Sequence, residues 1–327
     1  MSEPRVVLGL SAVVVAVTEE APHVLVTSAG RSLTGLPFGP FDPGGDRTLE
    51  LTLRQWVREQ TGFNIGYVEQ LYTFGDRGRE APLPELGKGG ADRVISVGYL
   101  GLTPERAAVD EAGARWRDWY RYFPWEDWRK GRPDLIDREI VPHLKSWIEK
   151  SGQAGEQCGD RIRLAFALDG APWNEERVLD RYELLYEAGL APEAARDRAR
   201  LEGREVAELS PTPATPAFGE AMLSDHRRIL ATAVGRLRAK IKYRPVVFEL
   251  IGETFTLLQL QRVVEAIAGL ELHKQNFRRL LERGDLVEGT GQFEARTGGR
   301  PAELFRFRRE GVRERPVGGV NVPAPRG

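Results

Sequence analysis

The chain has 327 residues, of which 41% are hydrophobic and 29% are charged, and its formal net charge is -1. This length leaves room for two domains, and no apolar run approaches the roughly 20 residues that a membrane-spanning helix needs. A single cysteine, Cys158, excludes an internal disulfide, and four scattered histidines argue against a Cys/His metal site. The composition predicts a globular, cytoplasmic protein with no membrane segment.

Strand-like and helical patterns alternate over the first 150 residues. β-branched runs bounded by Gly, Pro and polar clusters predict strands, and amphipathic stretches predict helices. Strands, a Gly- and Pro-rich loop and helices in this order indicate an α/β (α+β) sandwich. In chain order, we expect strands at 5–17 and 23–27, a loop at 35–45, a helix at 48–61, strands at 65–74 and 94–100, and a helix packing on the sheet at 134–150.

The helix over residues 48–61 carries the first chemical signal. Leu51, Leu53 and Val57 mark its apolar side, and Gly62 should end it. The loop and helix, with the letters LPFGPFDPGG and LRQWVREQTGF, resemble a Nudix box, whose usual form ends R-E-U-x-E-E-x-G-U, where U is aliphatic or aromatic. The resemblance implies a Nudix-like nucleotide-sensing domain over residues 1–150.

A working Nudix box needs several carboxylates on one face of its helix. Its glutamates lie one, four and five places after the box arginine, where together they hold divalent metal ions beside a diphosphate. Two alignments of this chain with the box are open. Aligned on Gly62, the three positions hold Trp56, Glu59 and Gln60, and aligned on Arg54 they hold Gln55, Arg58 and Glu59.

Glu59 is the only carboxylate that survives in either alignment, and one carboxylate is a poor cage for Mg²⁺. We therefore expect no metal site, no catalytic residues and no enzyme activity. In this interpretation Glu59 orients a neighbouring arginine or caps a ligand hydroxyl. Two alternatives stay open: an active Nudix hydrolase of ADP-ribose or a related nucleoside diphosphate, and an amphipathic helix in an unrelated α/β domain.

The middle of the chain, residues 151–223, gives a weaker pattern and is expected to be a helical and linker region. A basic helix follows at residues 225–242, and its apolar stripe could connect two domains, form a dimer seam or pack in a core. Within the middle region we expect a short strand at 163–168, helices at 173–190 and 193–206, and a Pro-rich linker at 209–218.

Residues 255–307 have the order helix, turn, helix, hairpin. Thr256 is the expected N-cap of the first helix and Gly269 its end, and the second helix runs from near Leu272 to Gly284. This is the order of a winged helix-turn-helix, in which the second helix reads the major groove and the hairpin lies on the phosphates. The candidate DNA-binding residues are Lys274, Gln275, Asn276, Arg278 and Arg279 on the second helix and Arg296 and Arg300 in the hairpin.

The charge of the chain is unevenly distributed. Residues 224–313 hold 18 Lys and Arg against 11 Asp and Glu, a net charge of +7, which leaves -8 for the rest of the chain. Phosphate affinity comes from such a local excess. We expect a DNA-binding unit at 224–313, a flexible tail at 314–327, and a homodimer on a double-stranded, pseudo-palindromic DNA operator, since one winged helix reads few bases.

A Nudix-like domain followed by a winged helix is the architecture of the Nudix-related bacterial regulators of NAD metabolism. The carboxyl half is similar to them in KIKYRPVVFELIGETFTLLQLQRVVEAIAG, LHKQNFRRLLERGDLVEGTG and GGRPAELFRF, and the first half in YVEQLYTFGDRGR. The resemblance covers residues 35–100 and 224–309. It implies a repressor of NAD-biosynthesis or salvage genes whose Nudix-like domain needs no cofactor and senses ADP-ribose, NAD or ATP.

The expected nucleotide site can be narrowed by chemistry. Phosphate recognition without a metal needs arginine forks or backbone N–H groups, and an adenine ring needs a flat apolar surface. The candidate ligand-binding residues are Arg54, Arg77, Arg79 and Arg93 for the phosphates, Glu59 beside them, and Tyr72 and Phe74 for the ring.

Overall fold

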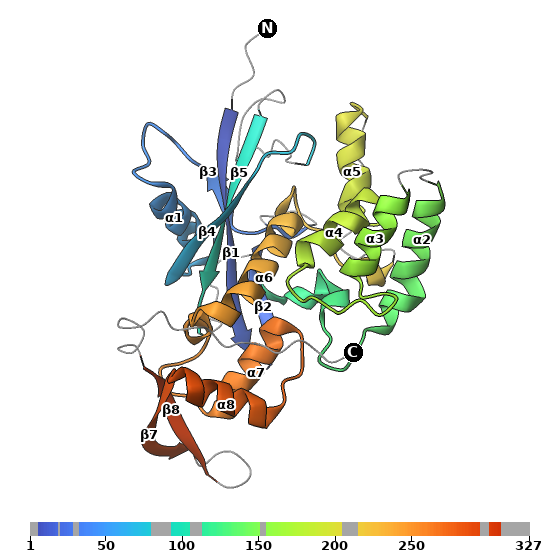
Figure 1. Cartoon of the computed structure of the whole chain (residues 1–327). Coiled ribbons are helices and arrows are strands. Elements are labelled where there is room, and N and C mark those ends of the chain that lie inside the picture. The colour runs from blue at the N-terminus through green and yellow to red at the C-terminus, as the bar shows by residue number, and fades with distance from the viewer. Residues whose placement is uncertain are drawn as a thin grey trace.

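The computed structural model describes residues 6–18, 20–28, 33–79, 93–104, 113–150, 155–204, 215–294 and 301–308 of the chain. A mixed β-sheet stands at the centre, with α1 (Leu49–Thr61) on one face and α6 (His226–Tyr243) on the other (Figure 1). A layer of short helices lies beyond α6, and a unit of two helices and a hairpin lies at one end of the sheet. The predicted α/β architecture is therefore present.

The long apolar strand β1 is the centre of the sheet. Its odd-numbered side chains from Val13 to Val17 pack toward α6, and its even-numbered ones from Leu10 to Val14 pack toward α1, so both faces of the strand are buried. β1 runs parallel to β5 and antiparallel to β2 and β3. The strands are β1 (Val6–Thr18), β2 (Ala21–Thr27), β3 (Phe38–Pro40), β4 (Tyr67–Phe74), β5 (Arg93–Leu102) and β6 (Ala114–Asp118), in the order β4-β5-β1-β2-β6 with β3 on β1.

Helix α1 begins and ends where its sequence predicts. The Thr48 hydroxyl accepts a hydrogen bond from the Leu51 N–H, and Gly62 ends the helix at a φ of 69°. Leu53 and Val57 are fully buried as predicted, but Leu51 is 50% exposed, so its assignment to the apolar side is wrong. Two residues correspond to about 200° of helical rotation, and Leu51 therefore points away from the side that Leu53 occupies.

Helix α6, predicted as a basic helix, is an element of the core. It packs on β1, β4 and β5 with one side and on α4 (Val178–Glu187) with another. Core packing, one of the three roles left open, is therefore present. The DNA-binding unit was predicted to start at residue 224, but α6, which lies after that position, packs on the sheet and on α4. The buried stripe consists of Ile229, Leu230, Ala233, Val234, Leu237 and Ile241.

The middle of the chain forms the helical layer beyond α6 (Figure 1). The predicted strand at 163–168 is instead the end of a helix and its following turn, since Ile162, Ala165 and Phe166 are buried at helical spacing. The helix predicted at 134–150 has α3 as its main neighbour and not the sheet. The elements are η1 (Trp119–Arg121), η2 (Pro124–Glu126), η3 (Ile136–Ile140), α2 (Val141–Lys150), α3 (Gly155–Ala165), α5 (Pro192–Leu201) and η5 (Pro216–Phe218).

The carboxyl-terminal unit has the predicted order of helix, turn, helix and hairpin. Thr256 and Gln259 form a reciprocal capping box at the start of its first helix, and Gly269 ends that helix at a φ of 69°. Backbone hydrogen bonds join Phe255 to Phe305 and so tie the hairpin to the first helix. Among the residues described, no helix is long and apolar enough to cross a membrane. The elements are η6 (Val246–Leu250), α7 (Leu257–Ala268), α8 (Lys274–Gly284), β7 (Val287–Glu294) and β8 (Ala302–Phe307).

Candidate DNA interface and nucleotide site

Helix α8 presents one apolar and one polar side. Phe277 and Leu281 are buried, while Leu280 is only partly buried. The polar side is the candidate DNA-reading face, and its predicted members are all exposed. They are Lys274, Gln275, Asn276, Arg278 and Arg279. Arg296 and Arg300 lie outside the described residues.

The cations on α8 differ from those on the hairpin strands. The side chains of Lys274, Arg278 and Arg279 form no hydrogen bond or ion pair with a described residue. By contrast, the Arg308 guanidinium, just after β8, lies 2.7 Å from Asp285, and the Arg306 guanidinium on β8 lies 2.5 Å from Glu288. Within the described part of the winged helix, the open positive charge is therefore on α8.

Part of the net charge of +7 that predicts DNA binding comes from basic residues that pair with carboxylates inside the protein. Six of the 18 basic residues lie on α6, whereas residues 247–308 hold nine basic and nine acidic residues. Helix α8 alone has four basic residues and one acidic residue. The excess available to a phosphate backbone is hence confined to a small face. The α6 cations paired with carboxylates of the body are Arg227, Arg228, Arg238, Lys240 and Lys242.

α1 lies on the face of the sheet opposite α6. The side of α1 that carries the Nudix-box positions forms hydrogen bonds with β3. The Gln60 side chain accepts a hydrogen bond from the Phe38 N–H at 3.1 Å and donates one to the Phe38 carbonyl. The Trp56 indole N–H donates to the Pro40 carbonyl at 3.0 Å. A Cβ at Gly39 would lie 2.1 Å from the Trp56 ring, so this position accepts only glycine. Two of the three box positions therefore hold the loop in place.

Glu59, the third box position, accepts a hydrogen bond from the Gln55 amide at 2.7 Å. It does not orient an arginine through any bond in the described structure. Among the described residues, no group of three His, Cys, Asp or Glu side chains is arranged to hold a metal ion. Glu59 is exposed and is a single carboxylate at this position.

The predicted ligand-binding residues lie in two places, on α1 and where β4 meets β5. Arg54 lies on α1, where it forms an ion pair with Glu50 at 2.8 Å and donates to the Ile65 and Gly66 carbonyls. The others gather where β4 ends and β5 begins, and Phe74 belongs to the core cluster that includes α6. This second group consists of Tyr72, Phe74, Arg77, Arg79 and Arg93.

Within the second group, exposure separates candidate ligand contacts from structural residues. Tyr72 is 61% exposed and makes an edge contact with the buried Phe74 ring, whose centroid lies 5.4 Å away. Arg77 and Arg93 are also exposed, and Arg93 donates to the Gly75 carbonyl. An exposed aromatic ring and two exposed guanidinium groups are the kinds of side chain that a nucleotide requires.

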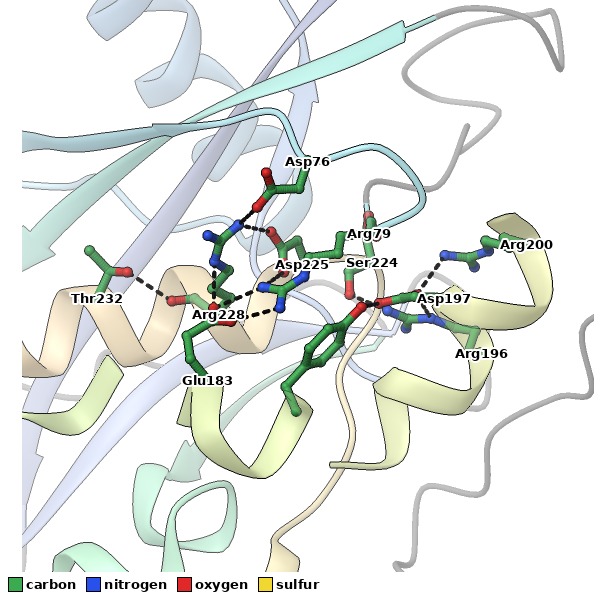
Figure 2. A network of polar contacts seen from close by, with 11 residues as sticks. Asp76, Arg79, Glu183, Arg196, Asp197, Arg200, Ser224, Asp225, Arg228 and Thr232 are labelled. Atoms are coloured by element: carbon green, nitrogen blue, oxygen red, sulfur yellow. Dashed lines mark hydrogen bonds and ion pairs between the residues drawn. The ribbon is translucent and has the colours of Figure 1, made fainter. Parts of the chain in front are cut away.

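Arg79 lies in a network that the sequence did not predict (Figure 2). Its guanidinium donates to both oxygens of Glu183 on α4, at 2.8 and 2.7 Å, and stacks 3.6 Å from the centroid of the Tyr186 ring. Burial opposes the charge of Arg79, but the bonds to Glu183 outweigh burial and raise its pKa above the ordinary value. In this structure its partners are protein side chains.

Arg228 on α6 joins the same network. Its guanidinium lies 2.7 Å from Glu183 and 3.2 Å from Asp225, and it forms an ion pair with Asp76 in the turn after β4. The network therefore connects the segment after β4 to α4 and to the first turn of α6 (Figure 2). The sequence gives no sign of this network, because its members are far apart in the chain and no short motif marks such a pairing.

A second network, also missed, is completely buried. The Arg181 guanidinium donates to both oxygens of Glu126, and Arg238 of α6 donates to Glu126 as well; all three side chains are fully buried. Burial lowers the pKa of Arg181. Burial also opposes the charge of Arg238, but Glu126 and Tyr120 outweigh it and raise the pKa of Arg238.

The family model described as "NrtR DNA-binding winged helix domain" matches residues 247–307. A curated protein of Acinetobacter baylyi, the "ADPR responsive transcriptional repressor NtrR", is 40% identical over 83 residues. That match covers 25% of this chain and 33% of the relative, so the chain spans about a third of the length of the curated protein it matches.

Solved structures extend the similarity to the whole fold. Shewanella oneidensis NrtR in complex with a 27mer DNA has a TM-score of 0.56 at 18% identity, over 97% of this chain and 99% of that one. S. oneidensis NrtR alone has a TM-score of 0.52 at 21% identity, over 92% and 94%. A MutT/nudix family protein from Enterococcus faecalis has 0.50 at 16%, over 94% and 88%. The predicted fold, a Nudix-like body followed by a winged helix, is confirmed.

Proposed function

We propose that the protein is a transcriptional repressor that binds a double-stranded operator, because residues 247–307 match the model of the NrtR DNA-binding winged helix domain. One observation carries the proposal: α8 holds Lys274, Arg278 and Arg279 exposed and without a partner among the described residues. Cationic forks of this kind can reach guanine edges and phosphates in a major groove. Genes of NAD biosynthesis or salvage are the proposed targets.

The proposed signal is a nucleotide bound by the Nudix-like body, drawn from ADP-ribose, NAD and ATP. ADP-ribose is the first to test, because the A. baylyi relative is named as ADPR responsive. The proposed contacts are Tyr72 for the ring and Arg77 and Arg93 for the phosphates, since these three side chains are exposed and lie on or next to the end of β4 and the start of β5. Arg54 and Arg79 already bind protein carboxylates.

The body is proposed to bind its nucleotide without hydrolysing it. A hydrolase would need several carboxylates on the α1 face to hold Mg²⁺ and position a water molecule. Trp56 and Gln60 occupy that face and bond to β3, which leaves Glu59 alone. This observation favours a sensor over the alternative of an active hydrolase.

The functional form is proposed to be a cytoplasmic homodimer. A single recognition helix contacts only a few base pairs, and two-fold symmetry doubles the site that is read. The nucleotide is expected to release the operator, which requires that it bind one geometry of the protein more tightly than the other.

Two measurements test the proposal. Selection from random duplexes, followed by gel shifts with and without each nucleotide, should give a pseudo-palindromic operator whose affinity falls in the presence of one nucleotide. Thermal shift identifies the nucleotide independently of DNA, because a ligand of the folded state raises the melting temperature. Failure to select any sequence would count against the repressor. Unchanged operator affinity with a nucleotide at saturation would count against the sensor.

A further inference from the structure

Helix α6 is a continuous rod between two ionic networks. It spans 18 residues, which corresponds to about 27 Å, and its apolar stripe is buried along its length. Gly235, near its middle, lets the neighbouring backbone approach closely, since a Cβ there would lie 2.7 Å from the Glu176 carbonyl oxygen. A helix packed this tightly moves as one body, so a displacement at one end reaches the other.

The first turn of α6 is tied to the segment after β4. Arg228 binds Asp76 of that segment and shares Glu183 with Arg79, as Figure 2 shows. Arg227, which is fully buried, donates to the Tyr122 carbonyl at 2.7 Å and lies 3.2 Å from Glu193 on α5. The proposed nucleotide contacts lie on the same segment and on the adjoining strand ends. A ligand there has a direct connection to α6.

The far part of α6 is tied to the end of α7. The Arg238 Nε donates to the Ile267 carbonyl at 2.9 Å, and the Tyr120 hydroxyl donates to the Ala266 carbonyl at 2.8 Å. The backbone N–H of Trp128 donates to the Gly269 carbonyl at 2.7 Å. These carbonyls end a helix and have no partner within it. We call this group of contacts the α7 clamp.

The electrostatics of the α7 clamp favour one orientation of the winged helix. The end of α7 carries a partial negative charge, and the Arg238 guanidinium lies against it. Glu126 holds that guanidinium from the opposite side. Burial raises the pKa of Tyr120 to about 12, so its hydroxyl stays a neutral donor. The Arg238, Tyr120 and Glu126 side chains are buried, so water cannot replace a bond that they lose.

Elsewhere the seam between body and winged helix is less tightly filled. A cavity of about 420 Å³ lies between the end of β1 and the start of α7, lined by Thr18, Pro104, Phe255 and Arg262 among others. A second cavity of about 310 Å³ adjoins it, with Pro104 and Phe255 on its wall as well. The α7 clamp is therefore the concentrated part of the attachment.

From these contacts we propose that Arg238 is the positioning residue for α8, and that α6 transmits displacements of the segment 75–79 to it. The proposal rests on the proposed function, since it concerns how a nucleotide would control DNA binding. Arg228 and Arg238 are ten residues apart, about 15 Å along the helix, and neither lies on the candidate DNA-reading face. Both should nevertheless alter the placement of α8.

Spin-label distances within one full-length chain test the proposal. In a Cys158→Ser background, spin labels are attached at Leu51→Cys on α1 and Glu282→Cys on α8, so that one label lies on the body and one on the winged helix. The labelled protein is mixed with excess unlabelled protein, so that the measured distances are those between two labels in the same chain. The parent should give one narrow peak. Arg238→Lys keeps the charge but loses the fork, and should broaden the peak and weaken operator binding about tenfold, within the usual range of coupling. Arg228→Ala should shift or broaden the same peak.

The matched control is Arg236→Ala, which removes an exposed arginine from the same helix. It should reproduce the parent in both measurements. A peak for Arg228→Ala that coincides with the control would overturn transmission along α6, and an unchanged peak for Arg238→Lys would overturn the positioning role. If the parent binds no operator, the proposed function fails, and the distance distributions still decide whether α6 links the two networks.

Discussion

The arginines of the body and those of α8 have the same chemistry and opposite environments. Arg181, Arg227 and Arg238 are fully buried, and each binds a carboxylate together with backbone carbonyls. Arg278 and Arg279 are exposed and bind no described residue. A guanidinium that is already paired and dehydrated is a cross-link, whereas an open one can receive a phosphate or a base edge. Burial, and not the charge count, separates the two uses.

The buried arginines of the body lose their hydration when the protein folds, and their bonds compensate for that loss. A buried arginine is stable only when its carboxylate and its remaining N–H groups are all matched. Arg181 reaches the Ala165 and Asn174 carbonyls beside Glu126, and Arg238 reaches Ile267. Each guanidinium thereby joins segments that the sheet alone would not hold together.

The largest effect is expected at Glu126. Glu126→Ala leaves Arg181 and Arg238 buried without a counter-charge, and it should lower the free energy of unfolding by about 3–5 kcal/mol. Urea denaturation followed by circular dichroism measures it. The matched control is Glu149→Ala on the exposed side of α2, expected to lie within about 0.5 kcal/mol of the parent. Equal effects for the two variants would mean that the buried network is energetically unimportant.

Arg278 should show the reverse pattern. Arg278→Ala is expected to leave the melting temperature unchanged, because the side chain has no partner among the described residues, and to cost about 1–3 kcal/mol of operator affinity if it forks onto a guanine. Fluorescence anisotropy with the selected operator measures the loss. Lys145→Ala on exposed α2 is the control for net charge. A loss no greater than that of the control would remove Arg278 from the recognition face.

The elements that could be predicted from the sequence depend on neighbours in the chain. The capping box at Thr256, the stop at Gly269 and the buried strand β1 follow from residues a few positions apart, and the structure has all three. The order of the winged helix followed from the same local signals. Leu51 and the predicted strand at 163–168 were wrong because short apolar patterns do not fix which face is covered.

The sites depended on partners far apart in the chain. The position of Arg79 in the sequence suggests a ligand contact, but Glu183 lies 104 residues away and nothing local indicates that the two pair. The excess charge of residues 224–313 was misleading for the same reason, since five cations of α6 bind carboxylates of the body. On α1 the carboxylate count needs no distant partner, because the relevant face is set by helical spacing alone, and its consequence for catalysis stays a prediction.

A smaller effect is expected where α6 meets β4. Partial burial would raise the pKa of Glu69, but hydrogen bonds from Lys240 and Tyr67 outweigh burial and lower it. A lowered carboxylate pKa gives stability that is present above the unfolded value of about 4.5 and is lost as the pH falls through the folded value. Glu69→Gln should therefore cost up to about 1 kcal/mol at pH 7 and progressively less below pH 4.5. A difference from the parent that stays constant with pH would exclude this origin.

The smallest effect is expected at Glu59, and it bears on whether the body is an enzyme. Trp56 and Gln60 bond to β3 where further carboxylates would have to lie, so Mg²⁺ has a single ligand to bind on that face. Adding Mg²⁺ should change nucleotide affinity little. Glu59→Gln should leave both stability and operator affinity within error of the parent, because the side chain is exposed and, among the described residues, bonds only to Gln55. Overnight incubation with ADP-ribose, NAD and diadenosine substrates plus Mg²⁺ or Mn²⁺, read by chromatography, should show no turnover. Hydrolysis at about one turnover per second is an ordinary enzyme rate. If such a rate were measured and were lost in Glu59→Gln, the body would be a hydrolase and not a nucleotide sensor.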